Sequence, residues 1–470
     1  MRLGRTTLLH FASQVGVSVA GFAATFAIAR LGGADVLGTY AVTVALMFWL
    51  SIPPTAVGDA VTKRLSEGGD AGRLLATGLL LELVIAVVLG GGLLLGSPLV
   101  ERLVGAPVGD LVALLVVSNV GLLTTISVLN GEKKVAQAGG LKTVERVVRS
   151  VIHVGAVLLS FGVAALVAGH VVSILVAAAV GAAIAGVRPS RPSWETARSL
   201  LRYARYGWLS QLKSRAFGWM DTIVLAFFAV GASLIGVYEV AWNLASLFVL
   251  VANSVQDTLF PEISEISVDG DYERVHHYLN EGLVFTGVFI IPGLFGAWVL
   301  GDRVLRIYNP EFTQGTAVLL ILVGARMLSA YGDQLVNVVN AVDRPDVAFR
   351  INLAFVAVNL VLNVALVSLY GWVGAAVATA ISAGVGLVLG YGALSRLIGR
   401  PSVPLSELLR QVLASGAMAV AVVGLEPTLP RNHYATVALV FLGVAVYTLV
   451  LVAVSSRVRG KARALIGTAG

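Results

Sequence analysis

The sequence predicts an all-α, polytopic membrane protein with about 14 transmembrane helices. Of its 470 residues, 57% are hydrophobic and only 13% are charged, whereas a soluble domain carries about 25% charged residues. The mean hydropathy is +0.88. Apolar runs of about 20 residues, long enough to cross the hydrocarbon core, recur from one end of the chain to the other. The chain has no Cys, which excludes disulfides, thiol redox chemistry and thiolate metal sites.

The predicted spans follow one another with short connections. They cover residues 7–29, 37–58, 74–96, 109–130, 144–163, 165–187, 206–229, 236–258, 278–300, 315–341, 347–369, 373–395, 405–425 and 435–455. The longest connection is basic and is interpreted as a linker on the cytoplasmic side or along the inner lipid surface. No connection could hold a soluble catalytic or nucleotide-binding domain. We therefore expect a protein that is not an enzyme and has no cofactor and no metal site.

The distribution of positive charge predicts the orientation. Most of the 33 Lys and Arg residues fall in alternate connections, beginning with the N-terminal segment. By the positive-inside rule these connections are cytoplasmic, so both termini are expected inside a multi-pass protein of the cell membrane. The net charge of +7 then belongs to the inner membrane face and does not predict a nucleic-acid partner.

The sequence also indicates an internal duplication. One constant shift aligns Gln14 with Gln211, and another aligns Asn130 with Asn340, with the order of spans preserved. An even number of spans separates the copies, so the repeats are expected to be parallel and to form two six-helix lobes around a central cavity. The predicted domains are an N-terminal lobe, a C-terminal lobe, and two additional helices with a cytoplasmic tail, over 1–190, 191–400 and 401–470.

Polar stripes on several spans are the candidate substrate-binding positions. A charged side chain at the bilayer centre costs about 2.5–3.5 kcal/mol on insertion scales and is normally retained where it faces protein or water. The first and seventh spans share one stripe, and the fifth, tenth and eleventh carry others. The candidates are Gln14, Ser18, Arg149, His153, Gln211, Arg215, Asp221, Arg326, Asp333, Asn337, Asn359 and Asn363.

Two interpretations of these stripes remain open. The polar groups could pair and fix helix packing, with the pairs Glu145–Arg149, Arg215–Asp221 and Arg326–Asp333. Alternatively they line a hydrated passage, in which a guanidinium group suits bidentate binding of phosphate. Two of the acids, Asp221 and Asp333, could instead bind a cation or a proton.

Four stretches give the chain a resemblance to a known family. They are Leu31-Gly-Gly-Ala-Asp-Val-Leu-Gly-Thr-Tyr-Ala41, Phe260-Pro-Glu-Ile-Ser264 with Gly270-Asp-Tyr-Glu273, Ile307-Tyr-Asn-Pro-Glu-Phe312, and Asn359-Leu-Val-Leu-Asn363 with Tyr370-Gly-Trp-Val-Gly-Ala-Ala-Val-Ala-Thr379. In this order over the whole chain, they resemble the polysaccharide-biosynthesis flippases of the multidrug/oligosaccharidyl-lipid/polysaccharide (MOP) exporter superfamily. The resemblance implies the MOP flippase, MATE-like fold. It supplies no short motif from which site residues can be transferred.

The resemblance also implies a function and partners. The expected substrate is an oligosaccharide on a polyprenyl or dolichyl phosphate or pyrophosphate, moved outward by alternating access, and the two C-terminal helices could help to hold its lipid tail. Membrane lipids, a coupling ion (H⁺ or Na⁺) and glycan-assembly enzymes are further expected partners. The alternatives are a cation-coupled exporter of organic cations and an integral-membrane glycan polymerase or ligase.

Overall fold

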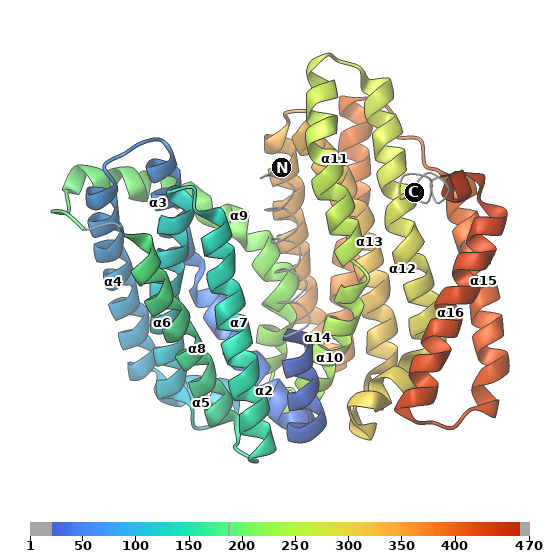
Figure 1. Cartoon of the computed structure of the whole chain (residues 1–470), viewed down its shortest axis with the longest axis horizontal. Coiled ribbons are helices and arrows are strands. Elements are labelled where there is room, and N and C mark those ends of the chain that lie inside the picture. Colours follow the sequence, from blue (N-terminus) through green and yellow to red (C-terminus); the bar gives the residue numbers. More distant parts are fainter. Residues whose placement is uncertain (1–20, 187–188, 461–470) are drawn as a thin grey trace. The chain divides into compact units, whose positions relative to one another are not determined.

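The computed structural model describes residues 21–186 and 189–460, and each regular element there is helical (Figure 1). Three short elements are a π-helical turn, η1 (Ile28–Gly32), and two 3-10 turns, η2 (Pro310–Gly315) and η3 (Glu426–Thr428). The α-helices are α2 (Gly33–Leu50), α3 (Ile52–Ser66), α4 (Ala71–Leu95), α5 (Ser97–Val104), α6 (Gly109–Gly131), α7 (Val135–Leu158), α8 (Val163–Ala185), α9 (Trp194–Phe227), α10 (Ala232–Leu247), α11 (Leu250–Val268), α12 (Tyr272–Tyr308), α13 (Thr316–Ala341), α14 (Pro345–Leu397), α15 (Leu405–Leu425) and α16 (His433–Val454).

The described ranges contain nine helices that are long and apolar enough to cross a membrane, and ten if the bent pair α10–α11 is one span. The chain is therefore an all-helical polytopic membrane protein. Three features account for the difference from the predicted number of spans. The first predicted span lies mostly outside the described residues, α7 and α9 are helical but carry several charges, and α14 contains two predicted spans.

The two halves of α14 are separated at Gly371. This residue has φ 58° and ψ −140°, a conformation that residues with a Cβ rarely adopt. A Cβ on Gly374 would lie 2.0 Å from the carbonyl oxygen of Leu366. In a continuous helix these two residues would be about 12 Å apart along the axis, so the chain must fold back between the eleventh and twelfth predicted spans.

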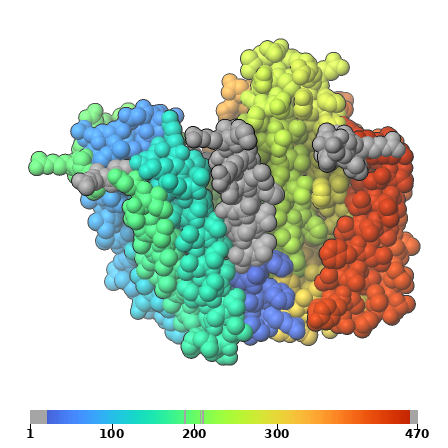
Figure 2. Space-filling model, viewed as in Figure 1, coloured from blue at the N-terminus to red at the C-terminus, as the bar shows by residue number. Residues whose placement is uncertain are grey.

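Packing divides the chain into two compact units, residues 1–236 and 237–470. In the described part of the first unit, α4, α6, α7 and α8 pack side by side, and α9 packs against α2 and α3 (Figure 1). In the second unit, α13 packs against α12 and α14, while α15 and α16 pack on each other and on α12. The atoms of α15 and α16, coloured red, form one continuous block in Figure 2. The three-part division predicted from the repeat remains a prediction.

The turns between helices recur along the chain. Lys133, between α6 and α7, and Asp343, between α13 and α14, both have left-handed backbones, with φ 62° and 58°. Their N–H groups donate to the carbonyl oxygens of Asn130 (3.0 Å) and Asn340 (3.1 Å), the residues that the sequence alignment pairs. Neither turn uses glycine, and a positive φ is uncommon for other residues. The matched turns support the duplication.

A second pair of connections ends in matching N-terminal helix caps, one in each unit. The side chain of Asp70 caps α4 by accepting from the backbone N–H of Arg73 at 3.0 Å. The side chain of Asp271 caps α12 by accepting from the backbone N–H of Arg274 at 3.1 Å. Each cap satisfies one N–H group that the first turn of a helix leaves without a partner.

Within residues 1–236, α2 and the first turn of α10 touch through paired glycines. A Cβ on Gly38 would lie 1.8 Å from the carbonyl oxygen of Ala232, and a Cβ on Gly236 would lie 1.9 Å from that of Ala34. The contact is reciprocal because both helices use the same spacing of small residues. Such spacing permits backbone contact and weak Cα–H···O interactions.

Candidate functional site: polar clusters and an apolar cavity

A buried polar network joins α2, α7 and α8; we call it the α2–α7–α8 network. Arg149 NH1 donates to His170 Nε2 at 2.8 Å, and the other ring nitrogen of His170, Nδ1, lies 2.9 Å from the Tyr40 hydroxyl. Arg149 Nε also lies 3.2 Å from Glu145 Oε1, which accepts from the Ser173 hydroxyl at 3.2 Å. The helical spacings 145–149 and 170–173 place these groups on facing sides of α7 and α8. The predicted Glu145–Arg149 pair is confirmed.

The donor inventory of this network fixes the state of His170. Arginine can only donate, so His170 Nε2 must accept and Nδ1 must carry the proton. His170 is therefore neutral here and donates to the Tyr40 hydroxyl. With His170 only 2% exposed, the network is closed to solvent on the His side. Arg149 has two partners, which favours the interpretation that it fixes helix packing.

His153, one turn after Arg149 on α7, contacts neighbouring helices through both a hydrogen bond and its ring. Its Nε2 is 2.9 Å from the carbonyl oxygen of Leu166, and its ring stands edge-on to Tyr40 with the centroids 5.0 Å apart. The side chain is buried. Its contacts connect α7 to α8 and α2, next to the network.

Arg215 on α9 has a different environment. Its guanidinium carbon lies 4.7 Å from the centre of the Phe48 ring on α2, and Phe48 stacks on Trp219 at 4.9 Å. The predicted Arg215–Asp221 ion pair is wrong among the described residues. Six helical positions place the two side chains on different faces, and Asp221 is buried on its own face.

Gln211 lies one turn before Arg215 on the same helix. Its side-chain amide donates to Asp59 Oδ2 at 3.4 Å and so joins α9 to α3. Two members of the predicted stripe on α9 therefore have different contacts. Gln211 is hydrogen-bonded to α3, and the half-buried Arg215 guanidinium lies over the Phe48 ring. The matching positions of the first span, Gln14 and Ser18, lie outside the described residues.

In the second unit, the predicted stripe on α13 is distributed over three contacts. The Arg326 guanidinium lies 4.9 Å from the ring centre of Trp242 on α10. Asp333 accepts from the Ser329 hydroxyl at 3.0 Å, one turn away on α13. The side-chain amide of Asn337 points to the Gln256 carbonyl oxygen on α11, at 3.5 Å.

Two of the asparagines of the eleventh predicted span, Asn359 and Asn363, are buried between the halves of α14. Asn359 Nδ2 lies 3.5 Å from both the Thr379 and the Ser382 hydroxyl oxygens. Asn363, one turn later, has no hydrogen-bond partner for its side-chain amide among the described residues. In the repeat alignment these positions correspond to Arg149 and His153, so the same helix interface carries charge in one copy and neutral amides in the other.

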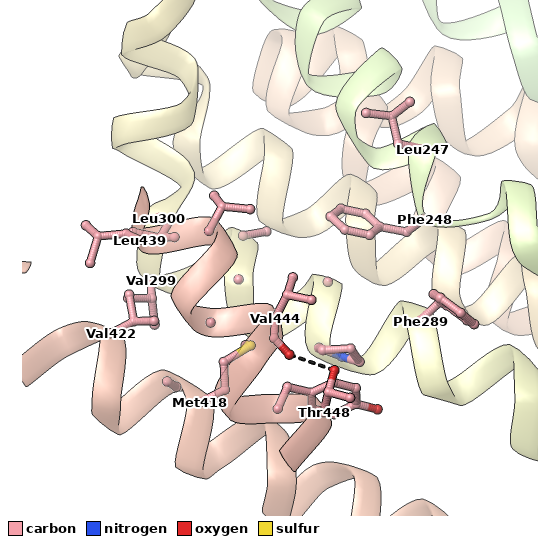
Figure 3. Close-up of a pocket in the computed structure, with 18 of the residues that line it drawn as sticks. Leu247, Phe248, Phe289, Val299, Leu300, Met418, Val422, Leu439, Val444 and Thr448 are labelled. Atoms are coloured by element: carbon pink, nitrogen blue, oxygen red, sulfur yellow. Dashed lines mark hydrogen bonds between the residues drawn. The ribbon is translucent and has the colours of Figure 1, made fainter. Parts of the chain in front are cut away.

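A cavity of about 530 Å³ lies in residues 237–470, bordered by α10, α11, α12, α13, α15 and α16 (Figure 3). Its lining is apolar except for two hydroxyl groups. The Tyr447 hydroxyl donates to the Val288 carbonyl oxygen at 2.8 Å. The Thr448 hydroxyl donates to the Val444 carbonyl oxygen at 2.7 Å, the bond dashed in Figure 3. Both hydroxyls have thus committed their protons, and the cavity offers its occupant mainly apolar contact and no free hydroxyl donor. Several lining residues, including Phe289, are also exposed on the outer surface.

Sequence reasoning missed several polar residues of these clusters. Tyr40 and His170 complete the α2–α7–α8 network from helices distant in sequence, and Trp242 provides the ring under Arg326. A signal for His170 was present, because a histidine with a nearby serine interrupts an otherwise apolar span. No local pattern identified Tyr40 as its partner.

Comparisons with known proteins agree on a family. A family model described as "Polysaccharide biosynthesis protein" matches residues 75–309. "Probable flippase AglR" of Haloferax volcanii is 33% identical over 99% of this chain and 98% of its own length. "Probable low-salt glycan biosynthesis flippase Agl15" of the same organism is 28% identical and covers 85% of this chain and 84% of that protein.

Solved structures agree on the fold. The lipid II flippase MurJ, in an inward closed conformation, superposes with a TM-score of 0.78 at 15% identity, covering 95% of this chain and 98% of that one. An inward-facing MATE multidrug resistance transporter of the MOP superfamily gives a TM-score of 0.66 at 14% identity, covering 81% and 95%. At such identities the likeness concerns the fold alone. These relatives are flippases and transporters, not enzymes. The chain belongs to the polysaccharide biosynthesis protein family and has the MurJ/MATE-like fold.

Proposed function

We propose that this protein is a flippase that moves a lipid-linked oligosaccharide from the cytoplasmic to the outer face of the membrane. The carrier is a polyprenyl or dolichyl phosphate or pyrophosphate, and movement occurs by alternating access with both termini in the cytoplasm. The product serves the synthesis of a surface polysaccharide or of glycoprotein glycans. The similarity to the probable flippases AglR and Agl15 supports this class of activity.

The observation that carries the proposal is the state of Arg215. Its guanidinium rests on Phe48 within a predicted span, and no described acid forms an ion pair with it. A half-buried guanidinium retains its charge and offers two parallel N–H donors. Phosphate oxygens match that geometry. Arg149, by contrast, already has Glu145 and His170 as partners, so Arg215 is the sharper candidate for headgroup binding.

The apolar cavity supports a lipid substrate. A chain without polar groups fits a lining whose hydroxyls are already hydrogen-bonded, and each buried CH₂ contributes about 0.8 kcal/mol. Its border includes α16, one of the two helices expected to help with the lipid tail. In this proposal the isoprenoid tail lies partly in the cavity.

The proposal is tested with purified protein in liposomes and a fluorescent polyprenyl-pyrophosphate disaccharide, quenched from outside by dithionite. Losing a charge-assisted hydrogen bond of about 1.5–3 kcal/mol should weaken use of the probe about ten- to hundredfold in Arg215→Gln. Arg198→Gln, which removes an exposed charge from the same helix, should behave as wild type. Equal flipping by both variants would refute the role of Arg215. Efflux of an organic-cation dye without flipping of the lipid probe would support the multidrug-exporter alternative.

The tail site is tested separately by filling the cavity. Val444→Trp places a large ring at the lining, whereas Val437→Trp places the same ring on an exposed position of α16 outside the lining. We expect Val444→Trp to slow flipping of a long-chain probe more than that of a short-chain probe. Chain-length dependence that is the same in the two variants would contradict tail binding in this cavity.

A further inference from the structure

Glu82 is a buried acid that the polar stripes do not include. It lies near the middle of α4 and is 2% exposed, and neither of its carboxyl oxygens has a hydrogen-bond partner among the described residues. Its neighbours along the buried face of α4 are small or apolar, with Gly78 one turn before and Ala86 one turn after. The opposite face of α4 is exposed and apolar.

Packing does not require an acid at this position. Gly78 fits against Val61 of α3 and Gly90 against Val117 of α6, and these contacts hold α4 in place. A Gln or Leu would continue the buried face without placing an acid in a low-dielectric setting. Retaining a carboxylate there is costly unless it is paired or neutralised. Such a residue within a membrane-spanning helix marks an ion or proton pathway by default.

Among the residues that the structure describes, no cation forms an ion pair with Glu82. The elements packed against α4 are α3, α5, α6 and α9. Their titratable groups include Asp59 and Lys63 on α3, Glu101 on α5, Asp110 on α6, and Arg205 and Lys213 on α9. None of these, nor any other described residue, hydrogen-bonds to the Glu82 carboxyl. The neutral, protonated acid is therefore the form that this site favours.

The carboxyl faces a glycine at the contact of α3 with α6. An ideal Cβ on Gly58 would lie 3.8 Å from Glu82 Oε1 and 2.3 Å from the Ser127 hydroxyl oxygen. The acid and the hydroxyl therefore approach the same small space from α4 and α6. Asp59, the next residue on α3, accepts from Gln211 on α9, one turn from Arg215. A change in packing at Gly58 would thus act on α9, the helix that carries Arg215, through the hydrogen bond between Asp59 and Gln211.

We propose that the Glu82 carboxyl is a proton-binding site of the transport cycle. The acid holds a proton while it is buried among α3, α4 and α6, and releases it when this contact opens to water. One carboxyl with one nearby hydroxyl gives too few oxygen ligands for a hard metal cation, which takes about six to eight when coordinated like Ca²⁺. The coupling role rests on the proposed flippase function, whereas proton binding by Glu82 does not.

Proton binding is tested by infrared spectroscopy of the full-length protein in liposomes. At neutral pH the wild-type spectrum should contain a carbonyl band of a protonated carboxyl that is missing in Glu82→Gln. The exposed control Glu195→Gln should retain this band. Glu82→Asp, which keeps the acid, should retain a protonated band. A wild-type minus Glu82→Gln difference without such a band would overturn the proposal, as would a Glu82→Gln variant that does not fold while Glu82→Asp folds with its acid ionised.

Coupling is tested with the fluorescent polyprenyl-pyrophosphate disaccharide over a series of pH values. We expect Glu82→Gln to flip the probe with a flattened pH profile, and Glu195→Gln to keep the wild-type profile. A wild-type profile in Glu82→Gln with intact flipping would refute the coupling role alone. Absence of flipping by the wild type would refute the proposed function, while the infrared result would still decide whether Glu82 holds a proton.

Discussion

Gly38→Ala is the substitution for which the structure gives the most direct expectation. The added Cβ would lie 1.8 Å from the Ala232 carbonyl oxygen and 2.7 Å from the Gly236 backbone nitrogen. Both are main-chain atoms, so no side chain can rotate away, and α2 must move roughly an ångström from residues 232–236. Overpacking of this kind costs about 1–3 kcal/mol. That exceeds the gain of up to about 1 kcal/mol in helix propensity from replacing Gly by Ala.

The matched control is Gly121→Ala, in the interior of α6. Nothing lies within 4 Å of the Cβ it would add, and the position is exposed. This variant should be neutral or more stable by about 0.5–1 kcal/mol. The melting temperatures of both variants are measured on the detergent-solubilised proteins, with size-exclusion chromatography used to monitor how much folded protein remains after heating. If Gly38→Ala melted at or above Gly121→Ala, the close contact between α2 and α10 would be refuted.

Three further substitutions address other features. Glu145→Gln should reduce stability by about 3–5 kcal/mol, because it leaves the largely buried Arg149 charge without its acid; normal folding yield and melting temperature would contradict the ion pair. Gly371→Ala should lose about 1–3 kcal/mol, since alanine must adopt the strained positive-φ backbone between the halves of α14, and an unchanged melting temperature would argue against the turn. Asp271→Ala should lose about 1 kcal/mol through its helix cap while Asp271→Asn loses less; equal melting of the two would show that the cap contributes nothing.

Much of the fold follows from the sequence because the membrane restricts the possible structures. Backbone groups in lipid must be satisfied within the span, so long apolar runs become helices, and the predicted spans correspond to helices throughout the described residues. Helix breaks were harder to predict. The bend of 44° between α10 and α11 has neither Pro nor Gly at the break to signal it.

The candidate clusters were only partly predictable. A polar stripe shows which face of a helix is polar, but it does not show which side chains of other helices contact that face. The Glu145–Arg149 pair is local and could be predicted from its spacing. The contacts of Arg149 with His170, and of His170 with Tyr40, depend on how three helices pack. Glu82 was missed because the stripes were sought as clusters, whereas a lone acid in an apolar span is itself a functional signal.

The recurring turns have a consequence for how the chain enters the membrane. Lys133 and Asp343 close tight connections whose hydrogen bonds lie within a few residues of the turn itself. Such a connection can form as soon as the second helix of a pair emerges, before any partner more distant in sequence has been synthesised. Each copy could then insert as successive helical hairpins. The conformational entropy lost in ordering the whole chain would then be lost in small steps, each of which closes only a short loop.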